Sequence, residues 1–232
     1  MSSQNRLITA LPPDEAEALG AALEPVELTF KQVLLEPEQP IRHAHFPMLG
    51  VVSLVNEGES GDVVEVATVG REGFIGLAVA LGAETMPSRA FVQIPGQAMR
   101  IEASALVGLM EAWPGLRRVL MRYAMALLNQ VAQNASCNRL HEVQERCARW
   151  LLQTHDRIDG DSFPLTHEFL GQMLGVHRPT VTIAAGMLQR AGFIRYARGV
   201  ITILDRAGLE GASCSCYRFI AREYNRLLGT AG

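Results

Sequence analysis

The stretch THEFLGQMLGVHRPTVTIAAGMLQRAGFIRYARGVITILD, residues 166–205, decides the fold of the C-terminal part of the chain. Apolar side chains recur on one face of its first segment and predict a short helix. Gly175 follows where a tight turn is needed. A second helix is expected from Arg178, because Pro179 would lie in its first turn, where the missing N–H costs nothing. Strand-like runs on either side of Gly199 predict a hairpin, so the whole stretch predicts a winged helix-turn-helix.

The second helix of this stretch has two unlike faces. Small and apolar side chains are expected to face inward, namely Val181, Ala184, Ala185 and Leu188. A recognition helix enters the major groove of DNA by its first turns. The predicted DNA contacts are therefore the residues of those turns, the cap of the first helix and the arginines of the hairpin: His177, Arg178, Pro179, Thr180, Thr182, Thr166, Arg195 and Arg198.

Alternatives stay open for the individual contacts. Arg178 can bond guanine in bidentate fashion or clamp a phosphate, and Thr180 can offer a groove contact or a capping or buried hydroxyl. Many helix hairpins contact protein instead of DNA. The competing function is therefore a small-molecule or redox-sensing signalling module whose helix pair binds a protein partner.

Composition limits the function classes. The 232 residues carry a net charge of −3, with 48% hydrophobic and 19% charged residues, which predicts a globular protein that is not basic throughout. We expect no signal peptide, no membrane-spanning helix and no membrane partner. The four cysteines, Cys137, Cys147, Cys214 and Cys216, are too few and scattered for a disulfide framework and indicate a reducing cytoplasm.

The N-terminal half has a different pattern. Residues 26–102 contain short β-branched runs separated by turn signals, which predict a small antiparallel barrel, roll or sandwich, after a short helix at 11–23. From about Ser104 the pattern changes, and residues 114–158 are helical over a length unusual for one globular helix. Either this helix breaks near residues 136–138, or it is a spine helix with a partner. Its apolar stripe is wider than one side of a small barrel can cover, which fits either a plain core helix or self-association. We favour a dimer interface, with the family resemblance given below as the main reason: Leu116, Val119, Leu120, Tyr123, Leu127 and Val131.

In the order of these parts the chain resembles the Crp/Fnr superfamily of bacterial transcription regulators. The most specific segments are GREGFIGLAVALG (70–82), RCARWLL (146–152) and residues 170–205. The resemblance implies an α+β fold with a cyclic-nucleotide-binding-like β-roll of the double-stranded jelly-roll type over residues 1–112. It also implies a dimerisation helix over 113–138 and a winged helix-turn-helix DNA-binding domain over 139–232.

The resemblance further implies partners. A homodimer would read a near-palindromic operator in double-stranded DNA, and an activator would also contact RNA polymerase. Arg178 matches the arginine that reads a guanine in relatives. Some relatives have a glutamate and a second arginine where this chain has Pro179 and Ile183, so the operator should differ from theirs.

The sensor segment also departs from the family. Gly76 is retained, but Leu77 stands where a glutamate would hold the ribose, and Ser88 and Arg89 are out of register for the cyclic phosphate. We therefore expect a degenerate effector pocket that binds neither cAMP nor cGMP. An iron–sulfur cluster is not expected either, because no cysteine precedes Cys137.

No cofactor or metal site is predicted, and the effector stays unknown. The spacing of His43 and His45 does not exclude haem, although a structural role for the pair is the favoured interpretation. Cys214 and Cys216 could form a redox switch, with ordinary reduced thiols as the favoured interpretation. The absence of G-x-S-x-G, P-loop and H-E-x-x-H motifs argues against an enzyme.

Overall fold

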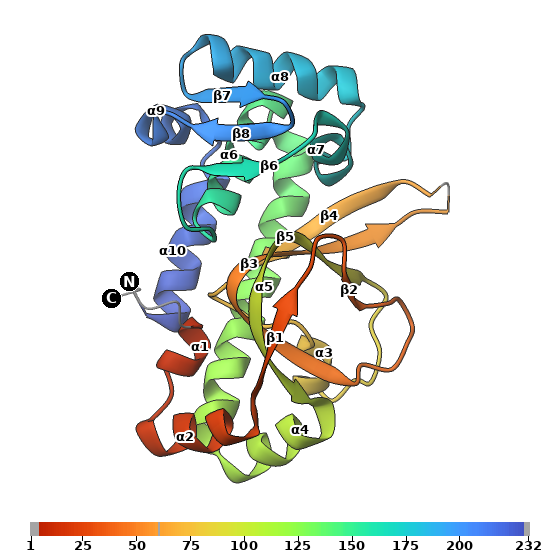
Figure 1. Ribbon diagram of the computed structural model, residues 1–232, viewed down its shortest axis with the longest axis vertical. Coiled ribbons are helices and arrows are strands. Elements are labelled where there is room, and N and C mark those ends of the chain that lie inside the picture. The colour runs from red at the N-terminus through yellow and green to blue at the C-terminus, as the bar shows by residue number, and fades with distance from the viewer. Residues whose placement is uncertain (1–4, 60, 230–232) are drawn as a thin grey trace.

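The structure is a computed structural model that describes residues 5–59 and 61–229. Figure 1 shows a curved β-sheet at one end and a group of short helices with a small sheet at the other. A long helix, α5 (Pro114–Leu140), runs between the two ends. This is the predicted α+β arrangement.

The N-terminal part is an antiparallel roll entered through two short helices, α1 (Arg6–Thr9) and α2 (Pro13–Ala22). Its strands are β1 (Glu24–Leu28), β2 (Val33–Leu35), β3 (His43–Glu57), β4 (Val63–Val69) and β5 (Arg89–Glu102). They are ordered β1-β5-β3-β4, and β2 also pairs with β5. The four-residue helix α3 (Leu77–Ala80) lies between β4 and β5.

Register shifts bend the long pair β3 and β5. One lies at Gly50, whose φ of 90° and close approach to β5 exclude a side chain, since a Cβ there would come within 2.6 Å of the Ile94 carbonyl oxygen. The sequence predicted separate strands at 90–96 and 98–102, but they form the single strand β5. The Pro–Gly pair that ends the first of these runs, a turn signal in the sequence, lies at a register shift within the continuous strand.

Helix α4 (Ala103–Ala112) leads into α5, whose first turn is capped from a distant part of the chain. The carboxylate of Glu15 accepts hydrogen bonds from the backbone N–H groups of Gly115, at 3.0 Å, and Leu116. A carboxylate suits this position because the first N–H groups of a helix lack internal partners. The contact fixes the start of α5 against α2.

The structure contradicts the prediction that the main apolar stripe of α5 is a dimer interface. Five of its six residues are buried in the chain's own core, and the sixth packs against that core: Leu116, Val119, Leu120, Tyr123, Leu127 and, half-buried, Val131. This face of α5 lies against the roll, with Tyr123 beside Phe74. It is therefore not free to contact a second copy of the chain.

The C-terminal part begins with α6 (Val143–His155). It continues with β6 (Ser162–Pro164), α7 (His167–Leu174), α8 (Arg178–Arg190), β7 (Ile194–Ala197), β8 (Val200–Ile203), α9 (Arg206–Ala212) and α10 (Cys216–Leu228). The strands form a sheet of order β6-β8-β7. Helix α10 then returns along α5, where the Tyr224 hydroxyl donates to Gln130 Oε1 at 2.7 Å (Figure 1).

The two parts share buried contacts. Val51, Val55 and Ile94 of the roll belong to the same apolar cluster as the side chains of α6 and α7. A buried ion pair of 2.8 Å joins Arg157, after α6, to Glu72 of the roll. Within the part of the chain that the structure describes, no helix has the length and apolar character required to cross a membrane.

Candidate nucleic-acid interface

Helices α7 and α8 are joined by the tight turn that the sequence predicted. The Thr166 hydroxyl caps α7 by accepting the Phe169 N–H at 3.1 Å. Gly175 ends α7 in the left-handed conformation, with φ of 63°. His177 is the N-cap of α8, and Pro179 lies in its first turn.

The two faces of α8 agree with the sequence pattern. The predicted packing face, Val181, Ala184, Ala185 and Leu188, is buried. The residues predicted to contact DNA at the helix entrance are all exposed: His177, Arg178, Pro179, Thr180 and Thr182. The exposed face continues with Ile183, which is 63% exposed, and Met187. Helix α8 thus offers a face of neutral and cationic side chains to a partner.

His167, which the sequence analysis did not single out, connects α7, α8 and the hairpin. Its Nδ1 lies 3.0 Å from the Thr182 hydroxyl, which donates to the Arg178 carbonyl oxygen at 3.1 Å. Because that hydroxyl has one hydrogen, His167 must donate through Nδ1. The imidazole also stacks on Tyr196 at 4.3 Å between ring centroids. Burial, and then the charge of Arg178, lower the pKa of His167, so the ring is neutral at pH 7.

The hairpin of β7 and β8 is the predicted wing. Its two turn residues, Arg198 and Gly199, have φ of 52° and 76°, as a two-residue primed turn requires. The Tyr196 N–H donates to Gln189 Oε1 of α8 at 2.7 Å, which fixes the wing to the recognition helix. Arg195 and Arg198 are both exposed on it.

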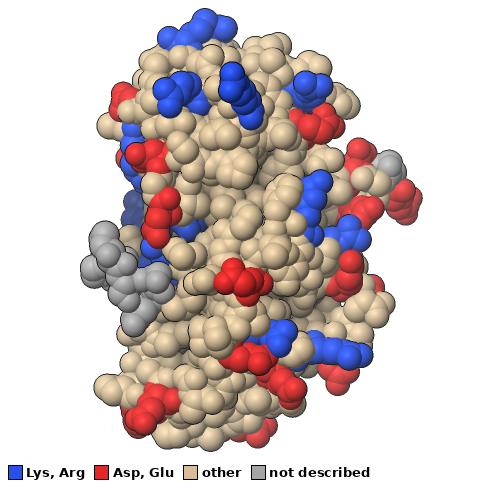
Figure 2. All heavy atoms as spheres, viewed as in Figure 1, with Lys and Arg blue, Asp and Glu red and all other residues tan. Residues whose placement is uncertain are grey.

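This end of the molecule is locally cationic although the chain is acidic overall. Residues 166–204 contain four arginines and one glutamate, against a net charge of −3 for the whole chain. Among the described residues, none of these arginines, Arg178, Arg190, Arg195 and Arg198, forms an ion pair within the protein. Figure 2 shows basic side chains across the end of the molecule that carries α8 and the wing. Unpaired surface arginines of this kind suit phosphate contacts.

The four predicted effector residues are engaged in contacts within the roll. Gly76 takes the left-handed conformation before α3, and Leu77 packs half-buried against the core. The Ser88 hydroxyl donates to Asn56 Oδ1 at 2.6 Å. The Arg89 guanidinium is paired with two carboxylates, at 3.0 Å from Glu36 and 3.5 Å from Glu57. Arg89 is therefore already neutralised.

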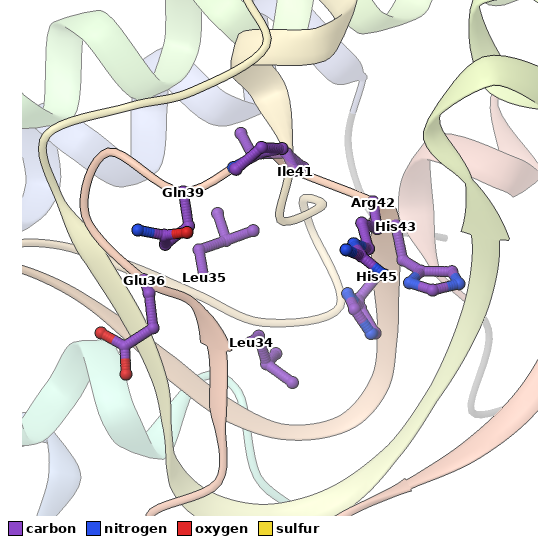
Figure 3. A pocket seen from close by; sticks show the side chains of 9 residues that line it. Leu34, Leu35, Glu36, Gln39, Ile41, Arg42, His43 and His45 are labelled. Atoms are coloured by element: carbon purple, nitrogen blue, oxygen red, sulfur yellow. The ribbon is translucent and has the colours of Figure 1, made fainter.

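A cavity of about 220 Å³ lies between the loop after β2 and the start of β3, on the side of Glu36, the partner of Arg89 (Figure 3). Glu36, Gln39, Arg42, His43 and His45 supply its polar lining. Burial, with the charges of His43 and Arg100, lowers the pKa of His45 to about 4, so this imidazole is neutral at pH 7. Gly76, Leu77, Ser88 and Arg89 are not among the lining residues.

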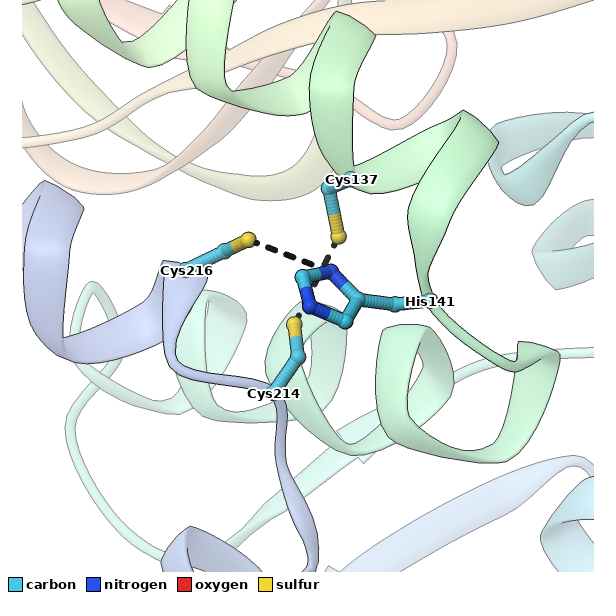
Figure 4. Close-up of side chains that lie close together, drawn as sticks. All are labelled: Cys137, His141, Cys214 and Cys216. Atoms are coloured by element: carbon cyan, nitrogen blue, oxygen red, sulfur yellow. Dashed lines mark hydrogen bonds between the residues drawn. The ribbon is translucent and has the colours of Figure 1, made fainter.

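Three cysteines meet at the end of α5. Cys137, Cys214 and Cys216 are buried together, with His141 beside them (Figure 4). The sulfurs of Cys137 and Cys214 are 3.5 Å apart, and a shared hydrogen bond lowers the pKa of Cys137 and raises that of Cys214. From the sequence, only Cys214 and Cys216 were expected to lie together. These four side chains could hold a metal ion, whereas burial raises the pKa of the separate Cys147 to about 12.

Comparisons with known proteins agree with this geometry. Residues 145–212 match the family model of the Crp-like helix-turn-helix domain. FixK2 from Bradyrhizobium japonicum has a TM-score of 0.71 at 16% identity, over 83% of this chain and 98% of that chain. A CRP/FNR-family transcriptional regulator from Thermus thermophilus has a TM-score of 0.66 at 23% identity, over 82% and 98%. A search of curated proteins found no match.

These matches confirm the predicted fold and the resemblance to the Crp/Fnr superfamily. Residues 145–212 are thus similar to a Crp-like helix-turn-helix domain, and the similar structure from Thermus thermophilus is that of a transcriptional regulator.

Proposed function

Since the chain has the Crp/Fnr regulator fold and a Crp-like helix-turn-helix domain, we propose that it is a homodimeric regulator that binds specific DNA sequences. The observation that carries the proposal is the division of α8. One face is buried in the domain, while the entrance exposes Arg178, Thr180 and no acidic side chain. Such a surface can approach base edges without repelling the flanking phosphates.

The exposed face of α8 defines the expected DNA contacts. Arg178 in the first turn can reach guanine O6 and N7, and the exposed Ile183 can contact a thymine methyl group. Thr182 is held by His167, so its hydroxyl positions the helix and only its methyl group is left for the groove. Arg195 and Arg198 of the wing would neutralise phosphates.

A second face of α5 supports dimerisation in place of the buried stripe. Leu128 is 59% exposed and Met125 is 44% exposed. The seam consists of residues in steps of four and three, which is the heptad spacing of a coiled coil: Met121, Met125, Leu128, Ala132 and Ala135. The alanines near the DNA-binding domain would let two copies of α5 approach closely.

The environment of Arg89 supports a sensor that does not bind cyclic nucleotides. Binding a cyclic phosphate there would require Arg89 to leave Glu36 and Glu57, and both carboxylates would then face the anion. Leu77 offers no hydrogen bond to a ribose hydroxyl. Isothermal titration with cAMP and cGMP should therefore give no binding heat at millimolar ligand.

Selection of sequences from a random DNA pool tests the proposed function. We expect enrichment of a near-palindrome whose half-sites lie about one helical turn apart. The Arg178→Ala variant should bind more weakly and lose the preference at one base pair per half-site. Arg117→Ala, which removes an exposed arginine at the far end of α5, is the matched control and should keep it. If the wild-type protein enriches no palindrome but captures a protein through α8, the helix pair is a protein-binding module.

A further inference from the structure

The thiol and imidazole groups at the end of α5 form a site that the DNA-binding role does not use. We propose that Cys137, His141, Cys214 and Cys216 bind one divalent metal ion of the zinc class in a closed tetrahedral site. This inference stands independently of the proposed function. It also replaces our expectation of no metal site, which did not consider these four side chains together.

The distances between the four side chains fit a single ion. Their ligand atoms all lie within 4.8 Å of one another. The Cys137 and Cys214 sulfurs are 3.5 Å apart, and the Cys216 sulfur is 3.4 Å from His141 Nδ1. In a tetrahedral site with zinc–sulfur bonds of about 2.3 Å, two sulfurs are about 3.8 Å apart. Figure 4 shows the four side chains directed toward one another, so little movement is needed to bind an ion.

The same compactness argues against an iron–sulfur cluster. In such a cluster the four ligands are divided among two or more irons, so at least some of the ligand atoms lie farther apart than four ligands of one ion do. Three thiolates and one imidazole around one ion are instead a common structural zinc set. All four positions are supplied by the protein, so the site would leave no open coordination position for catalysis.

Buried positive charge beside the cluster supports a metal–thiolate centre. Arg149 and Arg146 are 4% and 6% exposed, and among the described residues neither pairs with a carboxylate. Arg149 interacts electrostatically with Cys137, and Arg146 with both Cys137 and Cys214. Three thiolates around a divalent ion carry a net charge of −1, which would compensate these guanidinium groups better than neutral thiols do.

A neighbouring side chain also donates a hydrogen bond to one of the ligand sulfurs. Gln133 Nε2, one turn before Cys137 on α5, donates to the Cys216 sulfur at 3.0 Å. Hydrogen bonds of this kind orient ligand atoms around a metal. His141 is half-buried, whereas the three cysteines are buried, so its side is the route by which an ion would enter.

The positions of the ligands suggest what the ion would stabilise. Cys137 and His141 come just before the helix-turn-helix match at 145–212, and Cys214 and Cys216 come just after it. A bound ion would tie both ends of that domain to the end of α5. It would therefore fix the direction in which α8 is presented relative to the long helix.

Metal analysis of the full-length protein tests the site. Protein purified under reduction, with zinc supplied, should contain about one equivalent of zinc per chain. After exchange with cobalt(II), it should show the thiolate charge-transfer and tetrahedral d–d absorption bands. Cys216→Ala and His141→Ala should lose most of both signals, while His141→Cys should keep them because sulfur replaces nitrogen. Cys147→Ala removes a buried thiol outside the cluster and is the matched control.

Three results would overturn the proposal. One is zinc content that stays the same in wild type, Cys216→Ala and His141→Ala. Another is iron with acid-labile sulfide in the purified protein, which would identify a cluster. The third is four titratable thiols with no zinc retained, which would leave a dithiol pair at Cys137 and Cys214. Circular dichroism of each variant separates loss of metal from loss of fold, and none of these measurements involves DNA.

Discussion

The indole N–H of Trp150 in α6 donates a hydrogen bond of 2.8 Å to Glu65 Oε1 in strand β4, across the boundary between the DNA-binding domain and the roll. Glu65 is buried, and among the described residues its second oxygen, Oε2, has no partner. Desolvation raises the pKa of Glu65 to about 7. The contact between the two parts therefore contains a carboxyl group that titrates near neutral pH.

Glu65 should make stability depend on pH. Its folded-state pKa lies above the usual value near 4.5. The protonated carboxyl group therefore contributes fully to the free energy of unfolding below pH 4.5, and this contribution is lost as the pH rises through about 7. The total loss is on the order of 3 kcal/mol. Urea unfolding of wild type and Glu65→Gln at pH 5 and pH 8 measures it. We expect wild type to lose stability relative to the variant at pH 8, and an equal change in both proteins would contradict the assignment.

Replacing Arg178 should distinguish base reading from phosphate binding. If Arg178 reads a base, Arg178→Ala costs about 1–3 kcal/mol on the selected operator and relaxes preference at one base pair per half-site. Fluorescence anisotropy on operator and random DNA, with Arg117→Ala as control, measures this. An equal loss on both DNAs would make Arg178 a phosphate contact.

Leu128→Asp should separate the dimer. It places a charge in the exposed seam of α5, while the buried face of the helix stays intact. Sedimentation should give the monomer mass for this variant and the dimer mass for wild type. Leu81→Asp is the matched control, since Leu81 of the roll is equally exposed, at 58% against 59% for Leu128. A Leu128→Asp protein that remains dimeric would place the interface elsewhere.

Arg198→Gly should affect DNA binding and stability in different directions. Glycine accepts the φ of 52° that costs an L-residue about 1–2 kcal/mol, so the melting temperature should stay equal or rise. The lost charge should lower the salt dependence of DNA binding by about one phosphate contact. Arg198→Lys, which keeps the charge, should keep the salt slope. A clear fall in melting temperature for Arg198→Gly would mean that the arginine side chain stabilises the wing.

The sequence by itself determined the elements whose signals are local. The inward face of α8, the turn at Gly175 and the wing at Gly199 each depend on residues within a few positions of one another, so periodicity and turn chemistry were enough to predict them. The same reasoning predicted the roll but divided β5 into two strands. Proline and glycine are common both in turns and in strand bulges, so the Pro–Gly pair was interpreted as a turn.

Only the tertiary structure decided which face of α5 is buried. The helix has two apolar stripes, and the sequence favoured the more hydrophobic one, through Leu120 and Tyr123, as the dimer interface. The roll and α10 cover that stripe and leave the weaker one, through Leu128, exposed. Likewise, Cys137 and Cys214 lie 77 positions apart in the chain and meet only because α10 returns along α5. Contacts of this kind depend on how the helices pack, which no local pattern in the sequence records.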